Sequence, residues 1–131
     1  MTMKIILLAS CAVMCGATTT AVAADRVRPG QWETTLTVFG QTMTRPSCLS
    51  KADADAINGN EASIRAYTER VSQPAACKVK EVHIDGNTVS VTSTCASGKE
   101  NVGKTTYHGD SYETVNTNGT RATAKLVGRC Q

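Results

Sequence analysis

The chain has 131 residues, with 14 Lys and Arg residues against 11 Asp and Glu residues, and a formal net charge of +3. This length accommodates one domain. The positive charge is small and its Lys and Arg residues are dispersed. A nucleic-acid partner and an anionic membrane surface both select for clustered basic residues, so the composition argues against them.

The first residues have the three regions of an export signal. Lys4 supplies a positive charge, residues 5–13 are apolar, and Ala21-Val22-Ala23 is a small-x-small cleavage site, with Val22-Ala23-Ala24 as an alternative. The apolar run is shorter than the roughly 20 residues of a membrane-spanning helix. The pattern predicts a cleaved signal peptide over residues 1–23 and a periplasmic or secreted product.

A second interpretation of the same segment remains open. Leu8-Ala9-Ser10-Cys11 has the form of a bacterial lipobox, which would make the product a lipoprotein anchored through Cys11. In either case we expect one disulfide-stabilised, β-rich domain over residues 24–131 with no transmembrane segment. Loss of Lys4 would leave 13 basic and 11 acidic residues, a net charge of +2.

Four cysteines follow the signal, at Cys48, Cys77, Cys95 and Cys130. An even number of cysteines in an exported chain indicates disulfides, here two. A structural zinc site needs closely spaced pairs of cysteines, and these are 18 to 35 residues apart. We therefore expect no metal and no cofactor.

The sequence predicts β-strands on both sides of a helical block. Trp32, Leu36 and Val38 alternate with polar residues, as in a strand with one buried face, and are the predicted structural core. Tight-turn residues separate the other apolar or β-branched runs. The strands expected after this first one, which ends in a Gly40-Gln41 turn, are 42–46, 77–84, 88–95, 104–108, 111–117 and 120–130.

Between them, residues 49–71 change to a helical period. Ser50 and Asp53 resemble a capping box, Asn58-Gly59-Asn60 interrupts the helix, and a second helix starts at Asn60. Glu61 with Arg65, and Arg65 with Glu69, are expected ion pairs on its wet side. The prediction is a mainly β, α+β fold: a seven-stranded antiparallel meander, barrel-like or half-barrel, capped by the helical insertion.

Residues along the whole predicted domain resemble one family. Pro29-Gly30-Gln31-Trp32-Glu33-Thr34-Thr35 is similar to the PG-x-WE-x-T opening of the family called domain of unknown function 3617, which comprises short exported bacterial proteins. The similarity continues at Pro46-x-Cys48, Cys77-Lys78-Val79, residues 86–90 before Cys95, residues 109–112 and Gly128-Arg129-Cys130. The resemblance implies an exported β-rich domain with no established activity.

Two pairings of the cysteines compete. Cys48 and Cys77 bracket the helical block, so a Cys48–Cys77 bridge with Cys95–Cys130 would clamp it to the sheet, and we expect this pairing. The rival is Cys77–Cys95 with Cys48–Cys130, because Cys77 and Cys95 are equidistant from Gly86 in the turn between them.

The sequence contains no recognisable catalytic constellation. His83 and His108 stand outside any nucleophile motif, and the acidic residues near Asp53 fail the EF-hand spacing. Tyr107 and Tyr112 flank a turn at similar distances, which predicts a cross-strand aromatic pair. Trp32 is expected to plug the core, with a ligand cavity as the alternative role.

We therefore expect a non-enzymatic binding or accessory protein of the bacterial envelope. Its partner would be a small apolar molecule in the concavity of the sheet, or an envelope protein at its edge. The alternatives are a lipid-anchored structural protein of the envelope, or a hydrolase-like enzyme that uses Asp110 or His108. An enzyme should bring ionisable side chains together in one cleft, whereas a binding protein should have an apolar hollow.

Overall fold

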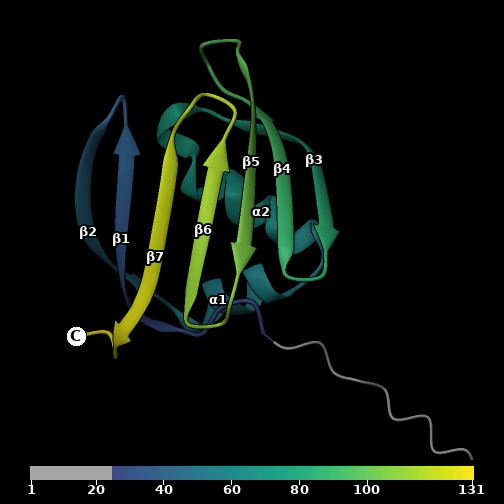
Figure 1. Cartoon of the computed structure of the whole chain (residues 1–131). Helices are drawn as coiled ribbons and strands as arrows, with labels where there is room; N and C mark the ends of the chain where they lie inside the picture. Colours follow the sequence, from purple (N-terminus) through teal and green to yellow (C-terminus); the bar gives the residue numbers. More distant parts are fainter. Residues whose placement is uncertain (1–24) are drawn as a thin grey trace, which may run out of the picture.

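The computed structural model describes residues 25–131, which form one seven-stranded antiparallel sheet with helices against one face (Figure 1). The predicted signal and Cys11 lie outside these residues. Neither α-helix in the described part is long and apolar enough to span a bilayer. The elements in chain order are β1 Gly30–Val38, β2 Gln41–Leu49, α1 Lys51–Asn58, α2 Glu61–Val71, the 3₁₀ turn η1 Gln73–Ala75, β3 Lys78–Asp85, β4 Thr88–Thr94, β5 Glu100–Tyr107, β6 Ser111–Asn116 and β7 Arg121–Gly128.

The sheet is open, with the strand order β2-β1-β7-β6-β5-β4-β3. Strands β3 to β7 form a continuous meander, and β1 then pairs with β7, so the first and last strands of the chain are neighbours. The helical block joins β2 at one edge to β3 at the other. The mainly β architecture is confirmed, and closure of the sheet into a barrel is not.

Side-chain caps determine where the two helices begin. The Ser50 hydroxyl accepts a hydrogen bond from the Asp53 amide (3.1 Å), and the Asn60 side chain accepts one from the Ser63 amide (3.0 Å). These bonds satisfy amides that have no partner within a helix. Both predicted helix starts are confirmed, and Gly59 ends the first helix.

Trp32 lies at the centre of the first of two core clusters. Its side chain is 2% exposed and packs with Val27, Ala54 and Ile57 of the helix side and with Ala124 of β7. Its indole N–H donates to the Arg28 carbonyl (3.0 Å). The second cluster joins α2 to the opposite end of the sheet through Ile64, Val79, Val82 and Val89. Leu36 and Val38, also predicted as core, are only partly buried and belong to neither cluster.

The segment before β1 fastens α1 to the sheet. Val27 and the Asn58 side chain exchange two hydrogen bonds, of 3.0 and 2.9 Å. The Arg26 guanidinium donates to the carbonyls of Ile57 and Gly59, while the Arg26 carbonyl accepts from the Gly109 amide. These contacts satisfy carbonyls at the end of α1 and hold that end beside the turn between β5 and β6.

Helix α2 covers the backbone of the β3 edge. The Glu69 carboxylate accepts from the Val79 amide (3.1 Å), and the Arg65 guanidinium donates to the carbonyls of Val79 and Lys80. Arg65 and Glu69 therefore bind the strand, and neither expected pair, Glu61–Arg65 or Arg65–Glu69, is among the ion pairs of the described residues. The reason is that a helix packed against an open edge meets unpaired backbone groups there.

The first turn also differs from the prediction. Val38 pairs with Gln41, so the two loop residues are Phe39 and Gly40 rather than Gly40 and Gln41. Both loop residues have positive φ, +51° and +75°, as in the two-residue turns whose twist matches that of the strands. Phe39 is consequently 97% exposed at the tip of the hairpin.

All four cysteines of residues 25–131 form disulfides, but the expected pairing is wrong. The bridges are Cys48–Cys130 and Cys77–Cys95. Cys48 is next to the last residue of β2 and Cys77 directly precedes β3, and these strands are at opposite edges of the sheet. Gln31 of β1 instead pairs with Cys48 on one side and with Gly128 on the other, which brings Cys130 to Cys48.

Removal of each disulfide should destabilise the protein by a different amount. The bridges close segments with sequence separations of 82 and 18 residues. Chain-entropy estimates are ~4.5 kcal/mol for the long loop and ~3 kcal/mol for the short one. Urea unfolding of Cys48→Ser/Cys130→Ser should therefore show a larger loss than Cys77→Ser/Cys95→Ser. Equal losses, or a Cys48–Cys77 peptide in a non-reducing map, would contradict the assignment.

Candidate functional site

A cleft between the helices and the sheet has a predominantly apolar lining. We call it the helix–sheet cleft; its volume is about 180 Å³. Helices α1 and α2 form one wall and strands β4 and β5 the other. Its lining is Ile57, Ile64, Tyr67, Thr68, Val89, Val91, Gly103, Thr105 and Tyr107.

The sheet wall follows from the alternation of side chains along β5. Tyr107, Thr105 and Gly103 are alternate residues, and their partners on β6 are Tyr112, Thr114 and Asn116. Because alternate residues share a face, all three point toward the helices. The wall therefore changes along the strand from an aromatic ring to a hydroxyl and then to a glycine without a side chain.

Four of the five aromatic residues of the chain collect beside this cleft. The Tyr107 and Tyr112 rings are 5.8 Å apart, which confirms the predicted pair, and Tyr112 lies 5.5 Å from Trp32. Tyr67 of α2 packs against the same cluster, and the Arg70 guanidinium lies over the Tyr67 ring, 5.5 Å from its centroid. Trp32 thus fills the core, as predicted, and supports the cleft indirectly through the tyrosines.

The tyrosine hydroxyls of the cleft remain protonated over the physiological range. Burial, reinforced by the neighbouring Tyr112, raises the pKa of Tyr107 to about 12, although a hydrogen bond with Thr105 partly opposes this. Burial also raises the pKa of Tyr67, and the nearby Asp53 carboxylate adds to the effect. Both groups therefore offer neutral hydroxyls, and the cleft lining carries no charged side chain.

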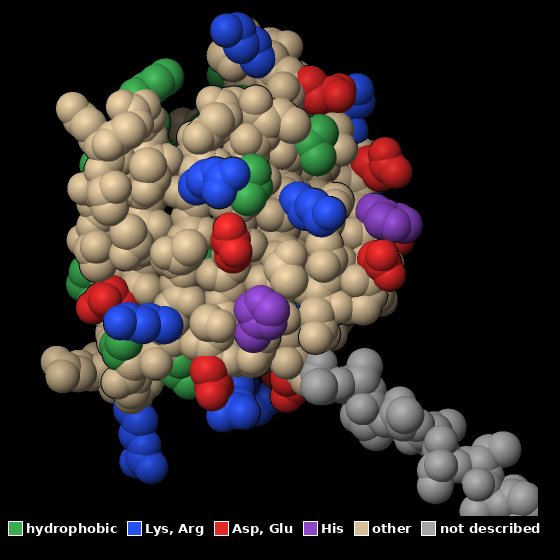
Figure 2. Space-filling model, in the orientation of Figure 1, with side chains coloured by type: hydrophobic (Ala, Val, Ile, Leu, Met, Phe, Trp, Pro, Cys, Tyr) green, Lys and Arg blue, Asp and Glu red, His purple; other side chains and the backbone are tan. Residues whose placement is uncertain are grey.

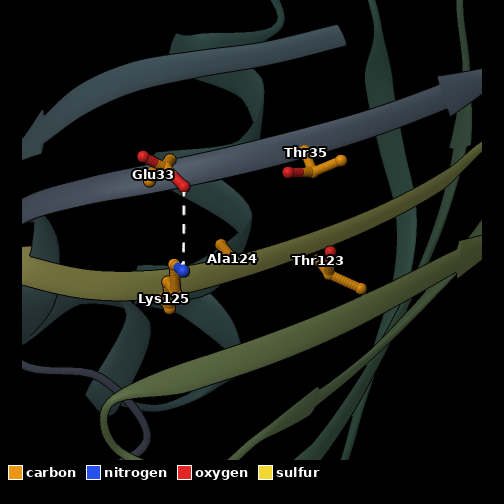
Figure 3. A pocket seen from close by; sticks show the side chains of 5 residues that line it. All are labelled: Glu33, Thr35, Thr123, Ala124 and Lys125. Carbon is orange, nitrogen blue, oxygen red and sulfur yellow. Dashed lines mark ion pairs between the residues drawn. The ribbon is translucent and has the colours of Figure 1, made fainter. Parts of the chain in front are cut away.

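The opposite face of the sheet is open and polar. Figure 2 shows it covered mainly by uncharged polar side chains and backbone, with scattered charges. A hollow of about 200 Å³ lies there over β1 and β7, lined by Glu33, Thr35, Thr123, Ala124 and Lys125 (Figure 3). Glu33 and Lys125 face each other at 3.8 Å and are both well exposed. This hollow offers two hydroxyls and an ion pair in contact with solvent.

The residues expected in a hydrolase-like site lie elsewhere, at the end of the sheet. His108 lines a polar hollow of about 460 Å³ with Asp25, Arg28 and Asn87, and Asp110 pairs with Arg28 at 3.1 Å. His108 and Asp110 are both exposed, and no Ser, Thr or Cys lines this hollow. His83 is exposed on the edge strand β3. Within residues 25–131, no group of three His, Cys, Asp or Glu residues has the arrangement of a metal site.

The sequence predicted the helix that starts at Asn60 and the pairing of Tyr107 with Tyr112, but it did not bring that helix to the tyrosine pair. The missing information was the contact between α2 and strands β4 and β5. The signal that was available is Gly103, an unsubstituted position inside a strand, which often marks a site where something approaches the backbone closely.

The fold and the site define a small disulfide-linked domain with an open antiparallel sheet, a two-helix cover and an apolar cleft between them. The model of the family described as Protein of unknown function (DUF3617) matches residues 27–130, and the chain belongs to this family. Comparisons with curated proteins and with solved structures gave no match.

The raised pKa of Tyr107 should make stability fall at alkaline pH. The unfolded chain loses this proton near pH 10 and the folded protein only near pH 12, so the stabilisation is complete below pH 10 and disappears as the pH rises through 12. Between pH 8 and pH 11 the loss should be about 1.4 kcal/mol. Urea unfolding at both pH values should show a smaller loss for Tyr107→Phe than for the native protein, and an unchanged loss would contradict the assignment.

Proposed function

We propose that this protein is a non-catalytic binding domain that holds a small, uncharged, apolar molecule in the helix–sheet cleft. The observation that carries the proposal is the cleft itself: about 180 Å³, with aliphatic and tyrosine walls and no charged lining residue. An engineered apolar cavity of about 150 Å³ in another protein binds benzene. The cleft therefore has room for one aromatic ring or a short alkyl chain.

The chemistry of the lining favours binding over catalysis. General acid–base catalysis is most effective when the pKa of the group lies near the working pH, and burial moves the pKa of Tyr107 away from neutrality. A nucleophilic hydroxyl also needs a base beside it, and no histidine or carboxylate lines the cleft. Its four side-chain hydroxyls, on Tyr67, Thr68, Thr105 and Tyr107, are suited to orienting a ligand.

Binding should be visible with a simple neutral aromatic probe. We expect ethylbenzene to shift the methyl NMR signals of Ile57, Ile64, Val89 and Val91, because these groups line the cleft. The signals of Val115 and Val127, which are exposed away from the cleft, should stay in place. Shifts confined to the exposed valines, or no shifts at all, would contradict the proposal.

A cleft-filling substitution provides the matched test of the same prediction. Val91→Phe adds a ring inside the cleft and should weaken ethylbenzene binding about tenfold or more, since it removes most of the space. Val115→Phe makes the same change on β6, at an exposed position on the open face of the sheet, and should leave ethylbenzene binding unchanged. Thr68→Phe fills the cleft from α2 and serves as the second variant if Val91→Phe perturbs the fold. Each variant is compared after its urea unfolding curve has been measured.

We also propose that the protein acts outside the cytoplasm, in the bacterial periplasm or as a secreted product. Two features support this: the signal-like N-terminal pattern, and two disulfides, which persist mainly in oxidising compartments. N-terminal sequencing of protein recovered from the expressing bacterium should begin at Ala24 or Asp25. A product that begins at a lipid-modified Cys11 would instead support the membrane-anchored alternative.

A further inference from the structure

Charged side chains close to the helix–sheet cleft are engaged in contacts outside its lining. The Arg70 guanidinium pairs with the Asp53 carboxylate and so links α2 to α1. Arg65 and Glu69 bind the backbone of β3. A charged ligand would therefore lose its hydration on entering the cleft without meeting an opposite charge, which is a large cost.

Hydroxyl groups make part of the cleft lining polar although it is uncharged. Thr105 of β5 shares a hydrogen bond of 2.8 Å with Thr114, and its hydroxyl also contacts Tyr107. A threonine hydroxyl has one proton and two lone pairs, so it can serve a further partner. Thr68 contributes a second hydroxyl to the lining from the helix wall.

The polar part of the lining continues at Gly103. A Cβ atom there would lie 2.7 Å from the side-chain oxygen of Asn116, so this amide occupies the space that a side chain would need. Asn116 in turn accepts a hydrogen bond from Asn101 (3.3 Å). Neutral amides and hydroxyls therefore follow one another along this part of the covered face, while Ile57, Ile64 and Val89 form the apolar part of the cleft.

We infer that the ligand is a neutral amphiphile: an aromatic or short alkyl group that fills the apolar part, joined to one hydroxyl group that bonds with Thr105 and Thr68. The inference rests on the proposed function and adds the chemical class of the ligand. It follows from a cleft whose lining combines aliphatic groups with neutral hydroxyls and has no charge to match an ionic head.

Four ligands of nearly equal bulk test the class on the unmodified protein. They are 2-phenylethanol, ethylbenzene, phenylacetate and phenethylamine, which differ in having a hydroxyl, no polar group, a negative charge and a positive charge at pH 7. NMR titrations that follow the cleft methyl groups give the four dissociation constants. We expect 2-phenylethanol to bind about threefold to tenfold more tightly than ethylbenzene, since it gains a hydrogen bond. Both charged ligands should bind at least about tenfold more weakly than 2-phenylethanol.

The role of the hydroxyl is tested by Thr105→Val, which keeps the shape of the side chain. This variant should reduce the preference for 2-phenylethanol over ethylbenzene, measured as the ratio of the two dissociation constants. Thr106→Val is the matched control, because Thr106 is the next residue on β5 and faces the opposite side of the sheet. The control should keep the preference of the unmodified protein.

The outcomes separate this inference from the proposed function. If none of the four ligands binds, the proposed function fails. If ethylbenzene binds but 2-phenylethanol binds no better, or if either charged ligand binds as tightly as 2-phenylethanol, the function stands and the ligand class is wrong. A preference that survives in folded Thr105→Val would overturn the role of Thr105. The four-ligand comparison needs no variant, so it decides the class even if Thr105→Val does not fold.

Discussion

The burial of Trp32 holds the segment before β1, the first helix and strands β1 and β7 together. Its ring packs against β7, the first helix and the segment before β1, and its indole N–H donates to the Arg28 carbonyl. Gly30 has φ +146°, and a Cβ atom there would lie 2.6 Å from the Gly128 carbonyl oxygen. Loss of a large buried aromatic side chain typically costs about 3–5 kcal/mol, a substantial part of the ~5–15 kcal/mol that stabilises a domain. The Pro-Gly-x-Trp segment therefore lets β1, the first described strand, lie close to β7, the last.

An open sheet with one covered face imposes the remaining requirements. Its cover must be attached at both ends, and it is: Asn58 and Arg26 hold α1 to the first described residues, while Arg65 and Glu69 hold α2 to the β3 edge. The other edge, β2, contains Pro46, which lacks an N–H and is tolerated in an edge strand. Because the helices are fastened at their ends and are short, they leave the cleft over β4 and β5 between the two attachments.

The two faces of the sheet explain why the cleft, and not the larger hollows, is the favoured site. On the open face and at the His108 end of the sheet, the ionisable groups are exposed. The ion pairs there, Glu33–Lys125 and Arg28–Asp110, are screened by solvent, so each contributes at most about 1 kcal/mol of interaction energy and would do little to orient a ligand. Inside the cleft, neutral hydroxyls lie among aliphatic groups and burial strengthens their hydrogen bonds. The low-dielectric surroundings that keep Tyr107 protonated also disfavour the entry of ions. Burial therefore explains both the raised pKa of Tyr107 and the neutral charge of the proposed ligand.

Local sequence determined the elements of this protein, and tertiary structure determined how they meet. The alternation around Trp32, the caps at Ser50 and Asn60, and the turns at Gly86 and Asn118-Gly119 each depend on a few adjacent residues, so each was predictable. The strand order, the Cys48–Cys130 bridge and the convergence of Tyr67 with Tyr107 depend on contacts between residues far apart in the chain. Insertion of β1 beside β7 put Cys48 and Cys77 at opposite edges, which no local pattern encodes. The periodicity of a sequence indicates which face of a helix or strand is apolar. Only the packing of the elements decides which element covers that face and where a cleft remains between them.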